Sequence, residues 1–246
     1  MNDPSWFESW FNSPYYHLLY RDRDQSEARP FIERLTRHLQ LPPHARVLDL
    51  ACGKGRHSIV LANLDYDVLG IDIAPENIAQ ANLSSRPGLS FAVHDMRTPL
   101  SAEPFDAVLN LFTSFGYFDT EAEHQAALHT MAQALKPNGK LVIDYLNVDP
   151  TLAQLVPKES RTIEGVHFEI SRKAVNGYLI KEIQLVDLKH HQSHTFSEKV
   201  ALFRKNDFER MLEPMNLSIE EVKGDYQLGP YDPLRSPRLI LLVGRK

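Results

Sequence analysis

The chain has only one cysteine, Cys52, among its 246 residues. No internal disulfide can form, and we therefore expect a cytoplasmic protein in a reducing compartment. Apolar runs long enough to span a bilayer are also missing from the sequence, so we expect no membrane partner. Residues 1–11 carry acidic side chains and no basic stretch, which argues against a secretory signal.

Basic residues are also fewer than acidic ones. The 27 lysines and arginines are outnumbered by 32 aspartates and glutamates, which gives a formal net charge of -5 at pH 7. Proteins whose main ligand is nucleic acid usually present a basic surface, so we expect no nucleic-acid partner. The sequence also lacks repeats and low-complexity segments, and its 43% hydrophobic content is typical of an ordinary globular protein.

Strands and helices alternate through the first 150 residues. The strands that we predict from short apolar runs span residues 46–52, 67–72, 89–94, 105–112 and 140–146. The helices that we predict from helical spacing and end signals span residues 26–40, 57–64, 75–83 and 121–135. Nearly continuous apolar strands separated by helices indicate an α/β fold, a doubly wound parallel sheet with helices on both faces.

The pattern becomes antiparallel after Asn147. Asn176-Gly177, between apolar runs at 166–175 and 178–186, is a strong signal for a two-residue hairpin turn. A further strand is expected at residues 197–203, and Asn206 is expected to cap a short helix that runs to Met211. The last two predicted strands, 217–222 and 239–243, return to the main sheet.

The end of the first strand carries a glycine loop. Residues 47–57 read V-L-D-L-A-C-G-K-G-R-H, with Asp49 near the strand end and Gly53 and Gly55 just before a helix. Open α/β sheets bind ligands at this place, where glycines let the backbone approach closely and the helix start offers free N–H groups. Alone, the glycine pair also fits an ordinary tight turn. Ser58 stands where a dinucleotide fingerprint needs a third glycine, and the spacing of a P-loop is absent.

Acidic and polar residues end the next three strands. Asp72 can accept hydrogen bonds from ribose hydroxyls, with Ile73 packed on an adenine face, although Asp72 also suits a helix cap. Asp95 can accept from an adenine amino group while the Met96 N–H donates to the ring. Asn110 begins the segment N-L-F-T-S-F-G-Y-F, whose polar residues among aromatic ones suit a cleft for a small substrate.

Taken in order, these motifs resemble those of the class I S-adenosylmethionine-dependent methyltransferases. Over residues 42–147 the matching segments are V-L-D-L-A-C-G-K-G, V-L-G-I-D, H-D-M-R, F-D-A-V-L-N-L-F and L-K-P-N-G-K-L-V-I-D. The resemblance implies S-adenosylmethionine as cofactor. It also implies a seven-stranded, mostly parallel sheet of order 3-2-1-4-5-7-6, with the last strand antiparallel and an antiparallel β annex inserted after strand 5. Ala51 departs from the glycine that is most frequent in the family.

The resemblance also implies roles for the matched residues. Asp49 would order the loop and lie near the methionine ammonium group, and the backbones of Ala51, Gly53 and Gly55 would line the methionine and ribose. Backbone carbonyls of Asn110 and Leu111 would touch the methionine portion. The full cofactor-binding set expected in this way is Tyr20, Asp49, Ala51, Gly53, Gly55, Asp72, Ile73, Asp95, Met96, Asn110 and Leu111.

A finer resemblance rests on the leader S-P-Y-Y-H-L-L-Y-R-D-R-D, the segment T-S-F-G-Y-F and the annex. Together they look like a bacterial subgroup of small-molecule N-methyltransferases that includes amino-sugar dimethyltransferases. The subgroup implies that N-terminal tyrosines fold over the cofactor and that the annex roofs the pocket. Tyr16 and Tyr117 are then the candidates for orienting an amine, although the N-terminal aromatic residues also suit a helix packing face.

The implied division of the chain has four parts. We expect an aromatic helical cap at residues 1–41, a Rossmann-like cofactor-binding core at 42–150, an annex over the substrate pocket at 151–205 and a return to the core sheet at 206–246.

The expected partner is a small-molecule substrate, and a homodimer is left open. Alternatives are a methyltransferase acting on RNA or protein, a nucleotide-binding oxidoreductase on a similar sheet, and a non-catalytic domain that retains the cofactor.

His190, His191 and His194 lie in a polar turn without a second ligand cluster, so we expect no metal site. Arg235 and Arg238 suit either an anionic substrate or a solvated surface.

Overall fold

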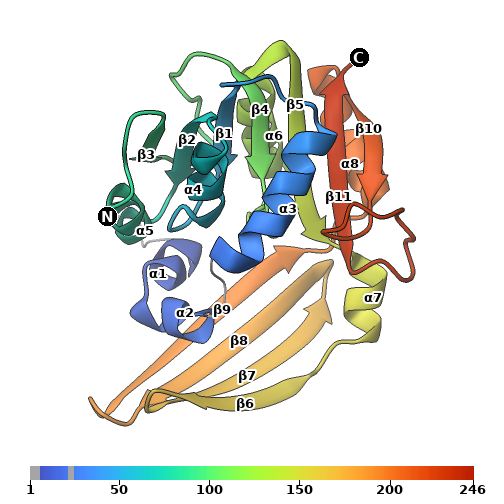
Figure 1. Cartoon of the computed structure of the whole chain (residues 1–246). Coiled ribbons are helices and arrows are strands. Elements are labelled where there is room, and N and C mark those ends of the chain that lie inside the picture. The colour runs from blue at the N-terminus through green and yellow to red at the C-terminus, as the bar shows by residue number, and fades with distance from the viewer. Residues whose placement is uncertain (1–5, 22–24) are drawn as a thin grey trace.

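A seven-stranded sheet forms the centre of the computed structural model, which describes residues 6–21 and 25–246 (Figure 1). Its strands are β1 (Arg46–Leu50), β2 (Asp67–Asp72), β3 (Leu89–Val93), β4 (Phe105–Asn110), β5 (Leu135–Leu146), β10 (Leu217–Lys223) and β11 (Arg238–Arg245). They lie in the order β3-β2-β1-β4-β5-β11-β10. β11 runs in the direction opposite to that of the other six strands. The predicted order, 3-2-1-4-5-7-6 with an antiparallel last strand, is confirmed.

Helices cover both faces of this sheet. One face carries α3 (Gln25–His38), α4 (Arg56–Asn63) and α5 (Pro75–Asn82), and the other carries α6 (Glu121–Gln133) and α8 (Lys205–Leu212), which is followed by the 3₁₀ turn η1 (Glu213–Met215). Successive strand residues alternate between the two layers, so Val47 packs in the first and Leu48 in the second. Burial on both faces is the reason that β1 and β4 read as continuous apolar runs.

A second sheet of four antiparallel strands forms the annex, which α7 (Val148–Ala153) joins to the core (Figure 1). Its strands are β6 (Lys158–Ile163), β7 (Val166–Val175), β8 (Tyr178–Asp187) and β9 (Gln192–Ala201). The hairpin predicted at Asn176-Gly177 is confirmed, and both residues have positive φ, as a type I′ turn requires.

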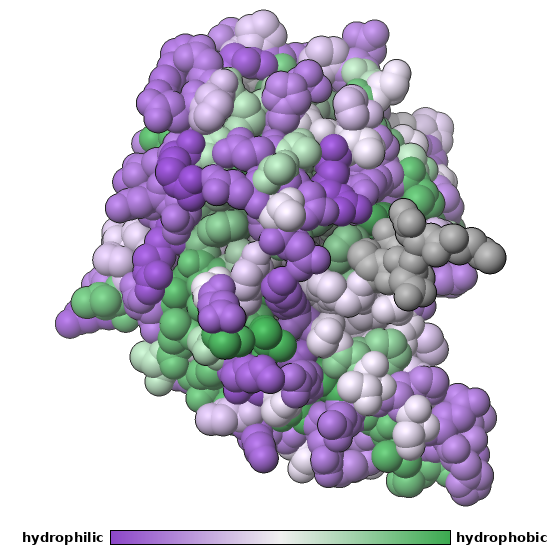
Figure 2. Space-filling view, turned by 180° about the vertical axis from the view of Figure 1, so that it is seen from behind, coloured by the Kyte–Doolittle hydropathy of each residue, from purple (hydrophilic) through white to green (hydrophobic). Residues whose placement is uncertain are grey.

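Two short helices, α1 (Trp6–Phe11) and α2 (Pro14–Leu19), lie between the core and the annex (Figure 1). Phe7 packs into the core beside Phe118, with ring centroids 6.0 Å apart. Trp10 is fully buried on the annex side, where its ring lies 4.7 Å from that of Phe196. From behind, hydrophilic side chains cover most of the core, while apolar side chains reach the surface where the core meets the annex (Figure 2).

Several element boundaries differ from the sequence-based expectation. The fifth strand begins at Leu135 rather than at residue 140, because the segment 137–139 stays in the strand as a register irregularity opposite β4 instead of turning the chain. Asn206 does not cap α8. The helix begins at Lys205, and the Asp207 carboxylate accepts the Arg204 N–H at 2.9 Å and thereby satisfies the helix start. β9 begins at Gln192 rather than at residue 197.

The expected N-terminal cap is divided between two neighbourhoods. α3 packs on α4 and the main sheet, whereas α1 and α2 contact the annex. Residues 1–5 and 22–24 of the expected cap lie outside the described residues. Within the residues that the structure describes, no helix is long and apolar enough to cross a membrane.

Core and annex meet at Gly116, in the loop after β4. Its carbonyl accepts the Ala201 N–H at 2.8 Å, and the Tyr145 hydroxyl donates to the Ala201 carbonyl. Gly116 has a φ of +93°, and a Cβ built on it would collide with the Tyr145 hydroxyl. Only glycine therefore fits this junction.

We expect Gly116→Ala to lower the free energy of unfolding by about 3 kcal/mol, because left-handed backbone strain adds to a steric clash. Gly177→Ala is the matched control, since Gly177 has a φ of +78° but no atom within 4 Å of an added Cβ. It should cost only the backbone strain, about 1 kcal/mol. Urea unfolding of both variants measures the difference, and equal losses would show that the junction tolerates a side chain.

Candidate active site

A cavity of about 300 Å³ lies at the carboxyl ends of β1, β2, β3 and β4, and residues of α1 and α2 form one of its walls. This is the place where open α/β sheets bind ligands. Most of the residues predicted for the site line the cavity: Tyr16, Tyr20, Ala51, Gly53, Asp72, Ile73, Asp95, Met96, Leu111 and Tyr117. Among the described residues, none of β6–β9 lines the cavity. The annex packs against α1 and α2, and these two helices carry the residues that face the cavity.

Three of the predicted residues lie behind the cavity wall. Asp49 is 1% exposed and accepts the Ser58 hydroxyl at 2.5 Å, and burial raises the pKa of its carboxyl to about 6. Asn110 donates from its side-chain amide to the Leu50 carbonyl at 3.1 Å. Gly55 has a φ of +81° at the start of α4, where a Cβ would lie 2.7 Å from the Phe91 ring. These three residues support the glycine loop on the side that faces away from the cavity.

Asp72 holds the glycine loop against the end of β2. Its carboxylate accepts the Gly53 N–H and the Ala74 N–H, each at 2.9 Å, and the Asn77 amide at 3.3 Å. Burial raises the pKa of Asp72 despite these hydrogen bonds. The helix-cap interpretation is partly right, because Ala74 takes the cap position of α5 while the Asp72 side chain binds its N–H. The same carboxylate also faces the cavity.

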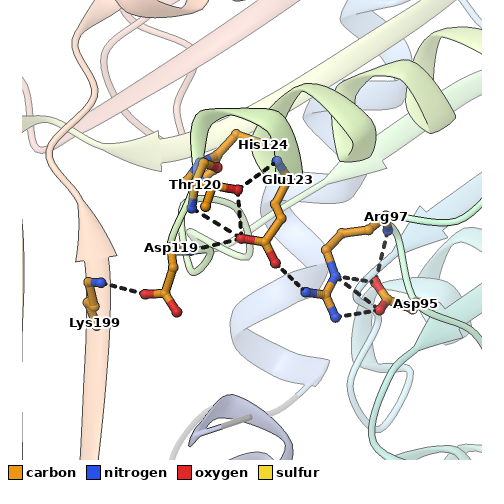
Figure 3. A network of polar contacts seen from close by, with 7 residues as sticks. All are labelled: Asp95, Arg97, Asp119, Thr120, Glu123, His124 and Lys199. Carbon is orange, nitrogen blue, oxygen red and sulfur yellow. Dashed lines mark hydrogen bonds and ion pairs between the residues drawn. The ribbon is translucent and has the colours of Figure 1, made fainter.

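Asp95 has a charged partner that the sequence analysis missed. The Arg97 guanidinium donates to both carboxylate oxygens, from Nε at 3.0 Å and 3.1 Å and from Nη2 at 2.7 Å (Figure 3). Partial burial raises the pKa of Asp95, but the Arg97 hydrogen bonds outweigh it and leave the pKa below its usual value. The Arg97 Nη1 also donates to Glu123 at 2.7 Å.

The three predicted tyrosines gather around α1 and α2. Tyr16 and Tyr117 both pack on Phe11, with ring centroids 5.1 Å and 5.5 Å away. The Tyr117 hydroxyl donates to the Thr113 carbonyl at 2.6 Å. The Tyr20 hydroxyl donates to Glu198 of β9 at 2.7 Å and contacts the Lys181 ammonium. These aromatic residues therefore line the cavity and pack the helices at once.

Basic residues around the glycine loop form a further part of the wall. His17, Lys54 and Arg56 line the cavity, and the Arg56 guanidinium lies 4.3 Å from the centre of the Phe112 ring. Burial, together with the Lys54 charge, lowers the pKa of His17 to about 4. His17 is therefore neutral at pH 7, and Lys54 and Arg56 supply positive charge at this end. In the sequence, Lys54 and Arg56 are recognisable as the two basic residues that flank Gly55.

The two late arginines have different environments. Arg235 is solvated, with 88% of its side chain exposed. Arg238 pairs with the buried Asp144 at 2.7 Å and donates to the Thr113 hydroxyl at 2.8 Å. Asp144 in turn accepts the Phe112 N–H at 2.8 Å, so the pair holds the loop after β4 rather than lining the cavity.

Comparison with known proteins gives matches along most of the chain. The family described as "Methyltransferase domain" matches residues 47–139. A putative methyltransferase, YqeM of Bacillus subtilis, is 37% identical over 107 residues, which cover 42% of this chain and 43% of that relative. The match thus spans less than half of YqeM. The dTDP-3-amino-3,4,6-trideoxy-alpha-D-glucopyranose N,N-dimethyltransferase of Streptomyces venezuelae is 26% identical over 219 residues, covering 85% of this chain and 91% of the relative.

Solved structures share the whole arrangement of core and annex. An S-adenosylmethionine-dependent methyltransferase from Clostridium acetobutylicum has a TM-score of 0.78 at 17% identity, covering 94% of this chain and 96% of the other. CalS10, an amino pentose methyltransferase from Micromonospora echinaspora, has a TM-score of 0.71 at 24% identity and covers 95% and 98%. These structures show the fold of the chain, and the methyltransferase domain match covers its glycine loop and the strands β1 to β4.

Proposed function

We propose that this protein is a class I S-adenosylmethionine-dependent methyltransferase that methylates the nitrogen of a small amine, and that the acceptor is an amino sugar carried on a nucleotide. The observation that carries the proposal is the cavity, which is lined by acids and glycines from the strand ends and by aromatic residues of α1, α2 and the loop after β4. Relatives named as amino-sugar N,N-dimethyltransferases align along 85% of the chain, which supports the choice of acceptor.

The residues present fit S-adenosylmethionine. A Cβ built on Gly53 would meet no atom within 4 Å, so the glycine leaves room for a ligand at the cavity edge. Asn77 lines the cavity, and its buried side-chain oxygen has no hydrogen-bond partner among the described residues, as expected of a group near a polar ligand. In this proposal Asp72 holds the ribose, Asp95 and Met96 hold the adenine, and the backbone at Leu111 lies beside the methionine portion.

When bound, the cofactor supplies an electrophilic methyl group on a sulfonium. The protein then has to exclude water and orient the acceptor, which together account for much of the rate gain in reactions of this kind. Phe11, Phe112 and Phe118 supply apolar walls. Because the Tyr117 proton is donated to the Thr113 carbonyl, the Tyr117 oxygen is set to accept an N–H from the amine. Tyr16, across Phe11, is proposed to share this role.

A small acceptor is favoured over RNA or protein by the size of the cavity and by the charge of the chain. The cavity has a volume of about 300 Å³ and is narrowed by α1 and α2, and the net charge of -5 does not favour a polyanion. In this proposal residues 1–41 act as a cap, 42–150 bind the cofactor, 151–205 support the cap and 206–246 complete the sheet. The lone cysteine, Cys52, is buried, which agrees with a reducing cytoplasm.

We predict that Asp72→Asn weakens binding of S-adenosylhomocysteine by about 10- to 100-fold, because a charged hydrogen-bond acceptor for the ribose is lost. Asp67→Asn is the matched control on the same strand, since Asp67 is 53% exposed at the far end of β2 and pairs with Arg46. Titration calorimetry of both variants and the native protein gives the comparison. Failure of the native protein to bind would refute the cofactor proposal itself.

The acceptor proposal predicts methyl transfer to dTDP-3-amino-3,4,6-trideoxy-alpha-D-glucopyranose. Label from methyl-labelled S-adenosylmethionine should appear on the sugar nitrogen, as followed by chromatography and mass spectrometry. Bulk RNA and denatured protein serve as comparison acceptors in the same assay. Label on RNA or on protein, with none on the sugar, would show that the acceptor belongs to that class and not to the amino sugars.

Tyr117→Phe should lower kcat by about tenfold with little change in S-adenosylhomocysteine affinity, because one orienting hydrogen bond to the acceptor is lost. Tyr178→Phe is the control, since the Tyr178 hydroxyl donates at 3.4 Å to the Asp119 carbonyl of the same loop but lies outside the cavity lining. Steady-state kinetics with the sugar nucleotide separates the two variants. Equal effects would mean that Tyr117 only supports the loop.

A further inference from the structure

A polar network runs from the adenine side of the cavity toward the annex (Figure 3). It starts at Asp95, passes through Arg97 to Glu123 in the first turn of α6, and continues to the loop before that helix. Glu123 Oε2 accepts the N–H of Asp119 at 3.2 Å and of Thr120 at 3.1 Å. Asp119 pairs with Lys199 of β9 at 2.6 Å.

Arg97 is the member that joins the two halves of the cavity. Its guanidinium contacts the carboxylates of Asp95 and Glu123, and it also lies 5.5 Å from the centre of the Phe7 ring and 5.1 Å from that of Phe118. Phe7 belongs to α1, and Phe118 belongs to the loop that carries Tyr117. One side chain therefore contacts the cofactor wall, the cap and the acceptor wall.

Arg97 occupies both oxygens of the Asp95 carboxylate. Oδ1 accepts the backbone N–H and Nε of Arg97, and Oδ2 accepts Nε and Nη2. A carboxylate offers about four acceptor sites on its two oxygens, and the single Nε proton is shared between two of them. An adenine amino group that takes one of these two sites confines Nε to the other oxygen, which fixes the orientation of the carboxylate and of the guanidinium bound to it.

We propose that Arg97 is a positioning residue that couples adenine binding at Asp95 to the ordering of residues 113–120, the acceptor wall. The inference rests on the proposed cofactor site. Arg97 is three-quarters buried, with 26% of its side chain exposed, so its ion pairs are screened less than surface pairs. Because coupling between two sites is reciprocal, ordering of the acceptor wall also strengthens cofactor binding.

Glu123→Gln removes the hydrogen bond between Arg97 and Glu123 and leaves the other bonds of the network in place. Glu123 Oε2 serves the Asp119 and Thr120 N–H groups, while Oε1 serves Arg97. Glutamine suits the same helix-start arrangement, so its oxygen takes over the role of Oε2 and its amide nitrogen faces Arg97, which it cannot bind. Glu121→Gln is the matched control, because Glu121 lies in the same helical turn, is 61% exposed and pairs with Arg210.

The experiment is hydrogen–deuterium exchange of residues 113–120 with and without saturating S-adenosylhomocysteine. In the native protein and in Glu121→Gln, the ligand should slow exchange by at least about fivefold. In Glu123→Gln it should slow exchange by less than about twofold. Arg97→Lys, which keeps the charge but lacks the fork of the guanidinium, should lose the protection in the same way.

Two outcomes overturn the inference while leaving the cofactor proposal intact. One is ligand binding to the native protein without slower exchange at 113–120. The other is full protection in both Glu123→Gln and Arg97→Lys, which would show that direct contact of the ligand with Tyr117 and Phe118 orders the wall. Absence of ligand binding to the native protein would overturn both proposals.

Discussion

The Asp72 carboxylate accepts the Gly53 N–H, and this hydrogen bond ties the end of β2 to the loop that follows β1. A buried carboxylate is stable only when donors surround it, and here Gly53, Ala74 and Asn77 supply them. The backbone of the glycine loop is thereby held open toward the cavity. The position of the loop in turn sets the start of α4 and the place of the basic residues around it.

The central sheet was predictable because its strands are buried on both faces. Residues of β1 and β4 are almost all buried and mostly apolar, and such runs bounded by turn signals leave little choice of structure. β6 was not predicted, because it is an edge strand of charged and polar residues without an apolar period. α1, α2 and α7 have six residues each, too short for helical periodicity to show in the sequence.

In the candidate site, too, some features could be predicted from the sequence and others could not. The positions of Asp72 and Asp95 at strand ends follow from strand prediction alone, since parallel strands bring their carboxyl ends to one edge. The partners of these acids do not follow, because Glu123 and Phe7 reach Arg97 from elements far away in the chain. The sequence also showed the aromatic leader without indicating that Phe7 and Trp10 would pack on opposite sides of one short helix.

The placement of α1 and α2 between cavity and annex makes one wall of the cavity depend on the packing of the annex. This wall is anchored by Trp10, whose ring packs in the annex and whose Nε1 donates to Glu198 at 2.8 Å. Phe168 and Phe196 pack in the same cluster as Trp10, although neither is among the residues that line the cavity. Substitutions in the annex can therefore change how firmly this wall is held while every group that lines the cavity stays the same.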